Sequence, residues 1–181
     1  KGYTITEKEQ EAAEIAILLH DIGHGPFSHV LEFTLLNEIH HEQVSHLLMQ
    51  KLNEHFGGQL SLAIDMFGDR YERKFFHQLI SSQLDVDRLD YLSRDSFYTG
   101  VREGFIGSER LLSMLDLKNE QLVLEEKGIY SIENFLMARR LMYWQVYLHK
   151  TAIAAETMLI QILRRAKDLM RTGYPLPVSK P

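Results

Sequence analysis

The chain has 181 residues, of which 45% are hydrophobic and 25% charged, the composition of one ordinary globular domain with a sizeable core. Its 25 acidic and 20 basic side chains give a formal net charge of −5, so no overall positive field attracts nucleic acid or an anionic membrane, and we expect neither as a partner. The absence of cysteine excludes disulfides, thiolate nucleophiles and thiolate metal ligands, and it favours a reducing, cytoplasmic compartment.

The first predicted element is a helix over residues 7–20. Thr6 followed by Glu9 forms a capping box, and apolar residues recur after it at helical spacing. The apolar run from Ile15 to Leu19 is too short to cross a bilayer, and no signal-peptide pattern precedes it. We therefore expect a soluble protein.

Helical spacing and glycine breaks predict further helices along the chain. We expect them over residues 28–37, 41–55, 60–67 and 74–95. A glycine-containing loop follows, Ser108 caps a short helix, and alternation over residues 115–117 and 121–125 predicts the one β-hairpin. Ser131 opens a last long helix that runs to about Thr172. The predicted fold class is all-α, a helical bundle with one small β-hairpin, in a single domain over residues 1–181.

Histidines gather where the first predicted helix ends. Of the nine in the chain, six lie within residues 20–46: His20, His24, His29, His40, His41 and His46. Imidazole nitrogens together with carboxylates suit Fe, Mn, Ni, Zn or Mg. His20 and Asp21 are adjacent, so they can share an ion only if the helix stops there, and Gly23 and Gly25-Pro26 supply that stop. This stretch predicts a metal or phosphate site.

A second candidate segment spans residues 83–95. On a helix, Asp87, Tyr91 and Asp95 recur every four residues and share one face, with Arg88 on its flank. Such a face could hold a metal, a phosphate and a sugar hydroxyl. The alternative is a solvated, salt-bridged helix face, which is the common origin of such charge patterns.

A third candidate segment lies on the last predicted helix. Phosphate recognition favours arginine forks and lysine point charges. Within three turns the helix carries Arg139, Tyr147, His149 and Lys150. The alternative is that the cationic side chains only cover apolar surface with their stems. We predict that Met137, Met142, Tyr143 and Trp144 belong to the core, and that His40, His46, His55 and His77 are surface or packing residues.

Three motifs follow one another along the chain. They are Leu19-His20-Asp21-Ile22-Gly23-His24-Gly25-Pro26-Phe27-Ser28-His29, then His41-Glu42-Gln43, and then Asp85-Val86-Asp87-Arg88-Leu89-Asp90-Tyr91 with Arg94-Asp95. In this order they resemble the HD-domain superfamily of phosphohydrolases, and more narrowly its deoxynucleoside triphosphate triphosphohydrolase branch. The resemblance runs from about residue 6 to residue 150, which is most of the chain.

The resemblance implies an HD-domain helical bundle and a set of site residues. A divalent metal ion (Mn, Fe, Mg, Ni, Co or Zn) is implied to bind an upstream histidine together with His20, Asp21 and Asp87. The catalytic histidines are implied to be His24, His29 and His41, which face the phosphates, with His24 and His41 as candidates for proton transfer. Contacts to triphosphate or sugar are implied for Arg88, Tyr91, Asp95, Arg139, Tyr147, His149 and Lys150.

The sequence departs from the family pattern at two places. Residue 88 is arginine where we expect lysine in the best-known vertebrate member, which preserves the charge but not the geometry. None of the first 19 residues is histidine, so the first metal ligand either precedes Lys1 or is absent. We expect both ends of the chain to be cut, and a missing upstream segment to carry this ligand.

The function implied is that of a metal-dependent phosphohydrolase acting on nucleotides, most specifically one that releases triphosphate from a deoxynucleoside triphosphate. One alternative keeps the metal centre but acts on another phosphomonoester or phosphodiester. A second alternative is a non-catalytic nucleotide-binding module that keeps the motifs without turnover. Family analogy also implies a homo-oligomer.

Overall fold

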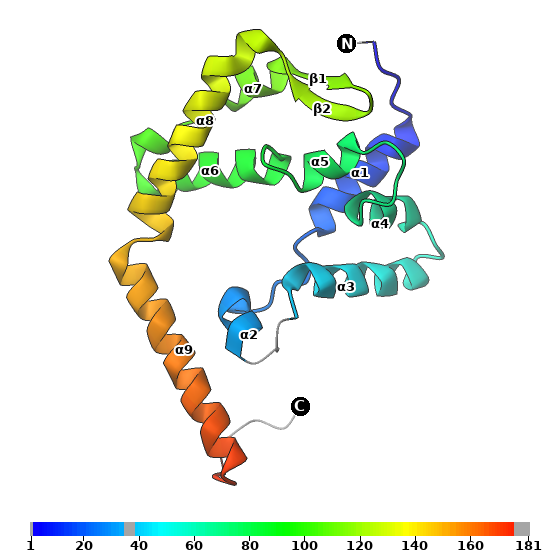
Figure 1. The fold of residues 1–181 in the computed structure, drawn as a ribbon. Helices are drawn as coiled ribbons and strands as arrows, with labels where there is room; N and C mark the ends of the chain where they lie inside the picture. Colours follow the sequence, from blue (N-terminus) through cyan, green and yellow to red (C-terminus); the bar gives the residue numbers. More distant parts are fainter. Residues whose placement is uncertain (1, 35–38, 176–181) are drawn as a thin grey trace.

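The computed structural model, which describes residues 2–34 and 39–175, consists of helices and one two-stranded antiparallel sheet (Figure 1). In chain order its elements are α1 (Glu7–Leu19), α2 (Ser28–Thr34), α3 (His41–His55), α4 (Ser61–Phe67), α5 (Phe75–Ile80), α6 (Val86–Thr99), the 3₁₀ turn η1 (Arg102–Gly104), α7 (Ser108–Met114), β1 (Leu115–Lys118), β2 (Gln121–Leu124), the 3₁₀ turn η2 (Glu126–Gly128), α8 (Ile129–Met142), the π turn η3 (Tyr143–Tyr147) and α9 (Lys150–Arg171). The all-α prediction with one hairpin is confirmed. Within the described ranges, none of the helices is both long and apolar enough to cross a membrane.

The first half of the chain is organised around the buried face of α1. Ala12 and Ala16 lie on this face, and their short side chains let α4 pack close against α1. Phe75 and Phe76 of α5 close the same cluster, each only 2% exposed. This packing fixes the direction in which α1 ends, and therefore where His20 and Asp21 project.

The second half of the chain is organised around α6 and α8. Leu92 of α6 and Phe135 of α8 are fully buried against each other's helices, together with Leu111 of α7. The hairpin bridges the two halves, because Leu117 and Leu122 pack on the first cluster while Leu124 packs on the second. α6 is thus held rigidly, with one of its faces left for the functional site.

The hairpin has the predicted position and a tight two-residue turn. β1 and β2 pair in register from Leu115 opposite Leu124 to Lys118 opposite Gln121. Asn119 and Glu120 between them have φ of 54° and 57°, the left-handed values that two-residue turns of this kind require.

The single helix predicted over residues 74–95 is wrong, because two helices lie there. The carboxylate of Asp85 is 4% exposed and accepts hydrogen bonds from the backbone N–H groups of Ser82, at 3.0 Å, and Arg88, at 2.7 Å. Asp85 therefore caps the start of α6 and fixes a break after α5. α6 also continues four residues past the predicted end, to Thr99, where Gly100 adopts φ 72°.

The single helix predicted from Ser131 to about Thr172 is also wrong. α8 passes into the π turn η3, and the backbone N–H of Leu148 bonds to the carbonyl of Tyr143 at 2.7 Å. His149 then turns out of helical geometry, and its Nδ1 accepts from the backbone N–H of Thr151 to start α9. The inserted π turn redirects the chain, so α9 leaves the direction of α8 and runs past α2 (Figure 1).

Two predicted helix ends differ from the structure or fall beyond the described residues. Gly107, not Ser108, occupies the N-cap position of α7, and Ser108 is the first helical residue. The last residues of the helix predicted over residues 28–37 lie outside the described residues.

A buried carboxylate ties α1 to the segment before α5. Glu9 is 7% exposed and accepts hydrogen bonds from Tyr71, at 2.9 Å, and from Arg73, at 2.8 Å. Its carboxylate also accepts from Thr6, which completes the predicted capping box. The hydrogen bond to the Thr6 backbone lowers the pKa of Glu9, burial raises it, and Arg73 lowers it further, so that the pKa falls from 4.5 to about 2.

We expect this ion pair to make the fold sensitive to acid. A carboxylate whose pKa is lower in the folded state contributes stability above its unfolded pKa, and this contribution is lost as the pH falls from about 4.5 through about 2. The difference between these two pKa values corresponds to about 3 kcal/mol of folding free energy at neutral pH. Urea unfolding of Glu9→Gln at pH 7 should therefore show a loss of this order, and little difference from wild type near pH 2.

The matched control is Glu11→Gln, which changes an exposed glutamate of the same helix. A Glu9→Gln protein that keeps the wild-type pH dependence of stability between pH 2 and 4.5 would contradict the role given to this carboxylate.

Candidate metal centre

The end of α1 is anchored to the start of α3 by a close backbone approach. The backbone N–H of Gly23 donates to Oγ of Ser45 at 2.9 Å. A Cβ atom at residue 23 would lie 2.3 Å from the carbonyl oxygen of His41 and from the backbone nitrogen of Ser45, so only glycine fits there. The predicted helix stop is thus also the contact that brings the first and second motifs together.

His20, Asp21 and Asp87 meet as the sequence predicts. Nε2 of His20 lies 3.4 Å from Oδ1 of Asp21 and 3.7 Å from Oδ1 of Asp87, which comes from the first turn of α6. The other ring nitrogen of His20, Nδ1, lies 2.6 Å from the carbonyl oxygen of Ile17 and therefore donates its hydrogen there. In this tautomer Nε2 presents a lone pair, as a metal ligand must.

This donor set fits a divalent metal ion. Two carboxylate oxygens lie within 3.7 Å of the lone pair of one imidazole nitrogen, and these electron-rich groups repel one another unless a cation lies between them. Burial raises the pKa of Asp87, the nearby His20 lowers it, and the neighbouring Asp21 raises it. A bound cation would offset the repulsion between the carboxylates and the burial of Asp87, so these three side chains are suited to hold an ion.

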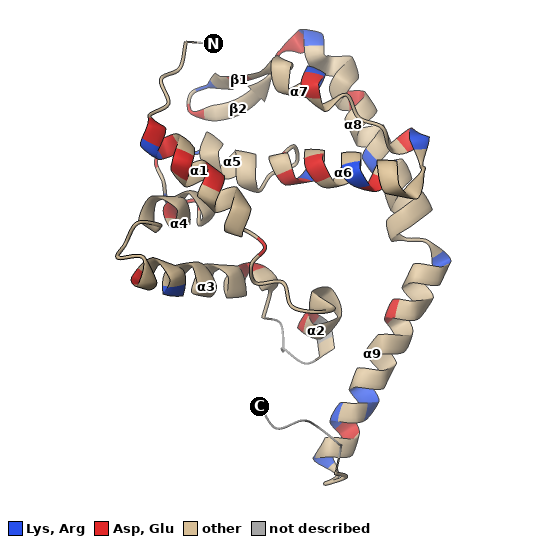
Figure 2. Ribbon diagram, turned by 180° about the vertical axis from the view of Figure 1, so that it is seen from behind, with Lys and Arg blue, Asp and Glu red and all other residues tan. Residues whose placement is uncertain are grey.

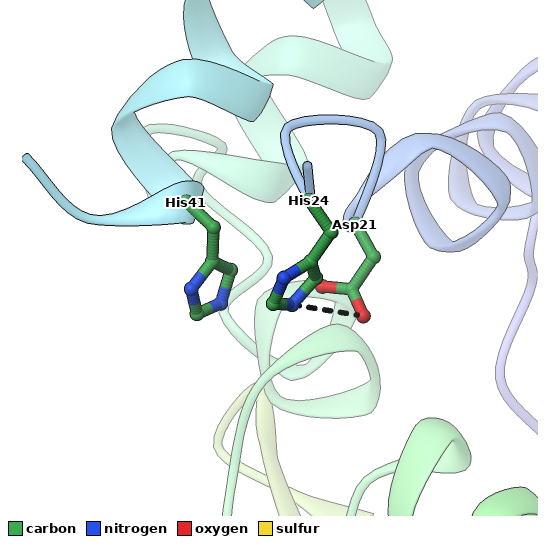
Figure 3. A group of neighbouring side chains, drawn as sticks. All are labelled: Asp21, His24 and His41. Atoms are coloured by element: carbon green, nitrogen blue, oxygen red, sulfur yellow. Dashed lines mark ion pairs between the residues drawn. The ribbon is translucent and has the colours of Figure 1, made fainter. Parts of the chain in front are cut away.

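A cluster of three histidines lies next to these residues. The rings of His24 and His41 stack with centroids 3.9 Å apart and an interplanar angle of 16°, and His29 meets both rings edge-on. Nε2 of His24 is 3.7 Å from Oδ2 of Asp21, which links the cluster to the metal centre (Figure 3). Burial lowers the pKa of His24, and the proximity of His41 lowers it further.

Two other sets of three donor residues are more compact than His20, Asp21 and Asp87. Within each set, Asp21 with His24 and His41, and His29 with Glu32 and His41, the ligand atoms lie within 4.8 Å of one another. In the first set the two imidazoles are stacked almost in parallel, so their in-plane lone pairs do not converge on one point. In the second set, a hydrogen bond already joins Nδ1 of His41 to Oε1 of Glu32. We therefore favour His20, Asp21 and Asp87 as ligands.

Glu32 is a functional candidate that the sequence reasoning missed. Its side chain is 4% exposed on α2, and its Oε1 lies 2.7 Å from Nδ1 of His41 and accepts from the His41 backbone N–H at 3.1 Å. Burial raises the pKa of Glu32, but the hydrogen bonds from His41 and His40 outweigh it and lower the pKa to about 2. The carboxylate therefore holds Nδ1 of His41 as the donor and leaves Nε2 free.

His40, predicted to be a surface or packing residue, also contacts this carboxylate, with Nδ1 3.4 Å from Oε2 of Glu32. The available signal for Glu32 was a carboxylate one helical turn after Ser28, in a predicted helix that follows two of the clustered histidines. Sequence spacing alone does not reveal that the helix is only partly exposed. That fact comes from the packing of α2 between α3 and α9.

We expect Glu32→Gln to lower kcat by roughly 10²-fold, because the amide lacks the charge that orients and polarises His41. A positioning role predicts that the pH profile of kcat and the tautomer of His41, read by ¹⁵N NMR, change together while metal content is kept. Glu54→Gln, at an exposed glutamate of α3, is the matched control. A variant that loses only thermal stability, with an unchanged pH profile, would assign Glu32 a structural role instead.

The candidate metal centre and the histidine cluster open into one cavity of about 640 Å³. Its walls come from the end of α1, from α2, α3, α6 and from the π turn. The lining residues include His20, Asp21, His24, His29, His41, Asp87, Arg88, Tyr91, Arg94, Tyr143 and Tyr147. Nine of the thirteen predicted site residues therefore share this cavity.

Three tyrosines form one wall of the cavity. Tyr147 meets the rings of Tyr91 and Tyr143 edge-on, and its hydroxyl donates to Oδ2 of Asp95 at 2.6 Å. Burial and this hydrogen bond raise the pKa of Tyr147. Asp95 is thus brought to the site through Tyr147. Tyr143, which we predicted to be a core residue, is instead 37% exposed on the cavity wall.

Two arginines near this wall have buried nitrogen atoms without a protein partner. Nη1 of Arg88 and Nε of Arg139 are buried, and neither donates a hydrogen bond to an acceptor among the described residues. Arg139 lies over the ring of Tyr143, with Cζ 5.4 Å from its centroid. Buried guanidinium N–H groups without acceptors are costly, so they mark a place where an anionic ligand would bind.

The remaining predicted residues lie apart from the cavity wall. His149 and Lys150 are exposed where α9 begins, and neither lines the cavity, so their role toward a substrate stays a prediction.

Two further residues predicted to be core are not: Met137 is 52% and Trp144 57% exposed on α8 and the π turn. Met142 is fully buried, as predicted.

Comparison with known families gives two matches along the chain. The model described as the HD domain matches residues 2–95, and the one described as the HD associated region matches residues 106–172. Among solved structures, a phosphohydrolase from Bacteroides thetaiotaomicron is 62% identical and superimposes with a TM-score of 0.93, covering 98% of this chain and 44% of that one. A hypothetical protein from Aquifex aeolicus is 31% identical, with a TM-score of 0.76 over 88% of this chain and 46% of its own.

Among curated proteins, the uncharacterized protein YwfO of Bacillus subtilis is 39% identical over 93% of this chain. The deoxynucleoside triphosphate triphosphohydrolase SAMHD1 homolog of Dictyostelium discoideum is 29% identical over 97% of it. The chain spans 40% of the length of the first relative and 37% of the second.

Proposed function

The chain belongs to the HD domain family, and on that premise we propose that it forms part of a metal-dependent phosphohydrolase acting on nucleotides, most specifically on deoxynucleoside triphosphates. The products would be the deoxynucleoside and triphosphate. The observation that carries the proposal is that one cavity joins the three metal-ligand candidates to the buried, unpartnered Nη1 of Arg88. The name of the Dictyostelium relative supports the choice of substrate class.

The residues divide into three roles in this proposal. His20, Asp21 and Asp87 would hold the divalent ion, which acts as a Lewis acid toward a phosphate oxygen when bound. Arg88 and Arg139 would neutralise phosphate charge with the guanidinium atoms that lack protein acceptors.

Proton transfer falls to the histidine cluster. His24 stands next to Asp21, while Glu32 orients His41, so each of these rings is held in place beside the ion site. His29 completes the cluster and would face the phosphates. The wall of tyrosines offers flat, partly polar surface for the sugar and base.

The test of this function is a product screen on the full-length protein. Deoxynucleoside triphosphates, ribonucleoside triphosphates, nucleoside monophosphates and phosphodiesters would each be incubated with Mn, Mg, Fe, Co, Ni or Zn. Release of intact triphosphate from deoxynucleoside triphosphates is the expected result. If only monophosphates or phosphodiesters were hydrolysed, they would be the substrates in place of deoxynucleoside triphosphates. Nucleotide binding without turnover would favour the non-catalytic module.

Arg88→Ala tests the division of roles. We expect the KM for the triphosphate to rise by roughly 10- to 100-fold while metal stoichiometry stays near wild type, since a charge-assisted hydrogen bond is lost at the phosphate and not at the ion. Arg110→Ala, on the exposed side of α7, is the control. If Arg88→Ala released the metal first, Arg88 would have to be placed with the ion and not with the phosphate.

Family analogy adds one further proposal, that the protein works as a homo-oligomer.

A further inference from the structure

α2 carries two residues of the proposed site, although it is a helix of only seven residues. His29 belongs to the histidine cluster, and Oε1 of Glu32 lies 2.7 Å from Nδ1 of His41. A helix of this length is unstable by itself, because two turns do not repay the cost of forming the first one. The contacts that α2 makes with other elements therefore decide where Glu32 lies relative to His41.

α2 lies between α3 and α9, and its two sides make different contacts (Figures 1 and 2). On one side Glu32 meets His41, the first residue of α3. Val30 and Thr34 are four residues apart, share another side, and are 5% and 6% exposed. Val30 lines a cavity of about 360 Å³ together with Leu159 of α9. The side of α2 next to α9 thus supplies its burial, and the side next to α3 supplies the functional carboxylate.

A polar contact joins the end of α2 to α9. Nζ of Lys167 donates to the carbonyl oxygen of Thr34, the last residue of α2, at 3.1 Å. The last carbonyls of a helix lack partners within it and carry partial negative charge, so an ammonium group there satisfies one and complements the helix dipole. Four basic residues lie in the C-terminal half of α9 (Figure 2): Arg164, Arg165 and Arg171 are exposed, whereas Lys167 is partly buried.

The opposite end of α2 begins from a strained backbone. Phe27, directly before α2, has φ 55°, in the left-handed region that residues with a bulky side chain rarely adopt. It is 69% exposed, so packing of its own ring does little to stabilise this conformation. Such a conformation persists only when the surrounding contacts hold it. The contact at the far end of α2 is one of those that oppose its relaxation.

We infer that Lys167 is a positioning residue, which holds the last carbonyl of α2 against α9 and thereby keeps Glu32 in contact with Nδ1 of His41. Without the ammonium group, α2 loses its anchor at one end while the strain at the other end remains. Glu32 then moves away from His41, and His41 no longer has one fixed tautomer. Lys167 does not line the cavity, so its effect on turnover, which rests on the proposed function, is indirect.

The first experiment reads the tautomer of His41 in the full-length protein by ¹⁵N-histidine NMR, with its signal identified by its absence from His41→Ala. Lys167→Met keeps the aliphatic stem but removes the ammonium group, and a mixture of tautomers is expected. Lys167→Arg keeps a cation with N–H donors and should restore the wild-type signal. Arg165→Met, which removes an exposed cation of the same helix, should leave the signal unchanged.

The second experiment asks whether Lys167 acts through Glu32. Lys167→Met should lower kcat by about tenfold while KM and metal content stay near wild type, because the proposed ligands of substrate and metal lie on other elements. In the double variant with Glu32→Gln, kcat should match that of Glu32→Gln alone within about twofold, since a contact that is already lost cannot be lost again. Independent effects would instead multiply.

A wild-type His41 tautomer in Lys167→Met would overturn the inference, as would rate losses that multiply in the double variant. A lower melting temperature with an unchanged tautomer would make Lys167 a structural residue only. Lys167→Gln, shorter and neutral, repeats the test if Lys167→Met does not fold. Because the tautomer is read without turnover, failure of this inference and failure of the proposed activity are separate results.

Discussion

Replacing Asp87 by alanine should leave a folded protein that has lost most of its metal and nearly all of its turnover. Asp87 is one of two carboxylates that approach Nε2 of His20, and a water molecule in its place supplies no negative charge. The ion contributes several kcal/mol to a reaction of this type, so kcat should fall by at least ~10³-fold. Metal stoichiometry by mass spectrometry and phosphate release, measured on the same sample, check both parts.

The control is Asp90→Ala, which removes an exposed carboxylate three residues later on α6 that pairs with Arg94 at 2.7 Å. It should keep the wild-type metal content. Because removing a partly buried charge from the site relieves repulsion between carboxylates, the melting temperature of the metal-free Asp87→Ala protein should not fall below that of the metal-free wild type. An Asp87→Ala protein with unchanged metal content would remove Asp87 from the ligand set.

The sequence was sufficient for the part of the site that depends on local rules. Gly23 had to end α1 for His20 and Asp21 to act together, and the structure places both at that end, with Asp87 opposite. The capping box at Thr6 and the hairpin across Asn119 and Glu120 also follow from a few neighbouring residues. Patterns that are satisfied within one or two turns can be recognised without knowing what packs around them.

The predictions that were wrong concern features that depend on contacts between distant segments. Helical periodicity continues across Asp85, and only the burial of its carboxylate, with two backbone donors, shows that a helix ends and another begins there. The π turn at Tyr143 likewise interrupts a periodic pattern. Because it changes which side chains face inward, Tyr143 moved from the expected core to the cavity wall and Trp144 to the surface.

Glu32 shows the same limit within the site. Its spacing from the histidines is unremarkable, and its role comes from burial on α2 together with a 2.7 Å contact to His41, on another helix. Metal ligands are easier to recognise because their residue types are restricted. Residues that orient other residues are ordinary in type, and only the three-dimensional arrangement identifies them.

For His24, a proton-transfer role and a structural role predict opposite effects of the substitution His24→Ala. Its ring stacks on His41 and lies 3.7 Å from Asp21, so it can reach a leaving or attacking oxygen near the ion without being needed as a ligand. If it transfers a proton, His24→Ala should lower kcat by roughly 10²- to 10⁴-fold, with metal content and melting temperature nearly intact. If it only fills the segment between α1 and α2, stability should fall and the rate per folded molecule should stay close to wild type.

The two forecasts separate when metal stoichiometry, melting temperature and kcat are measured on one preparation of His24→Ala, with His55→Ala at the exposed end of α3 as the histidine control. The same measurements on His41→Ala compare the two stacked histidines, of which His41 has its Nδ1 held by Glu32. A folded, metal-loaded His24→Ala protein with near wild-type turnover would leave His41 as the proton-transfer residue. A large loss in both variants, each still loaded with metal, would mean that the stacked pair acts as one unit, since removing either ring also releases the other.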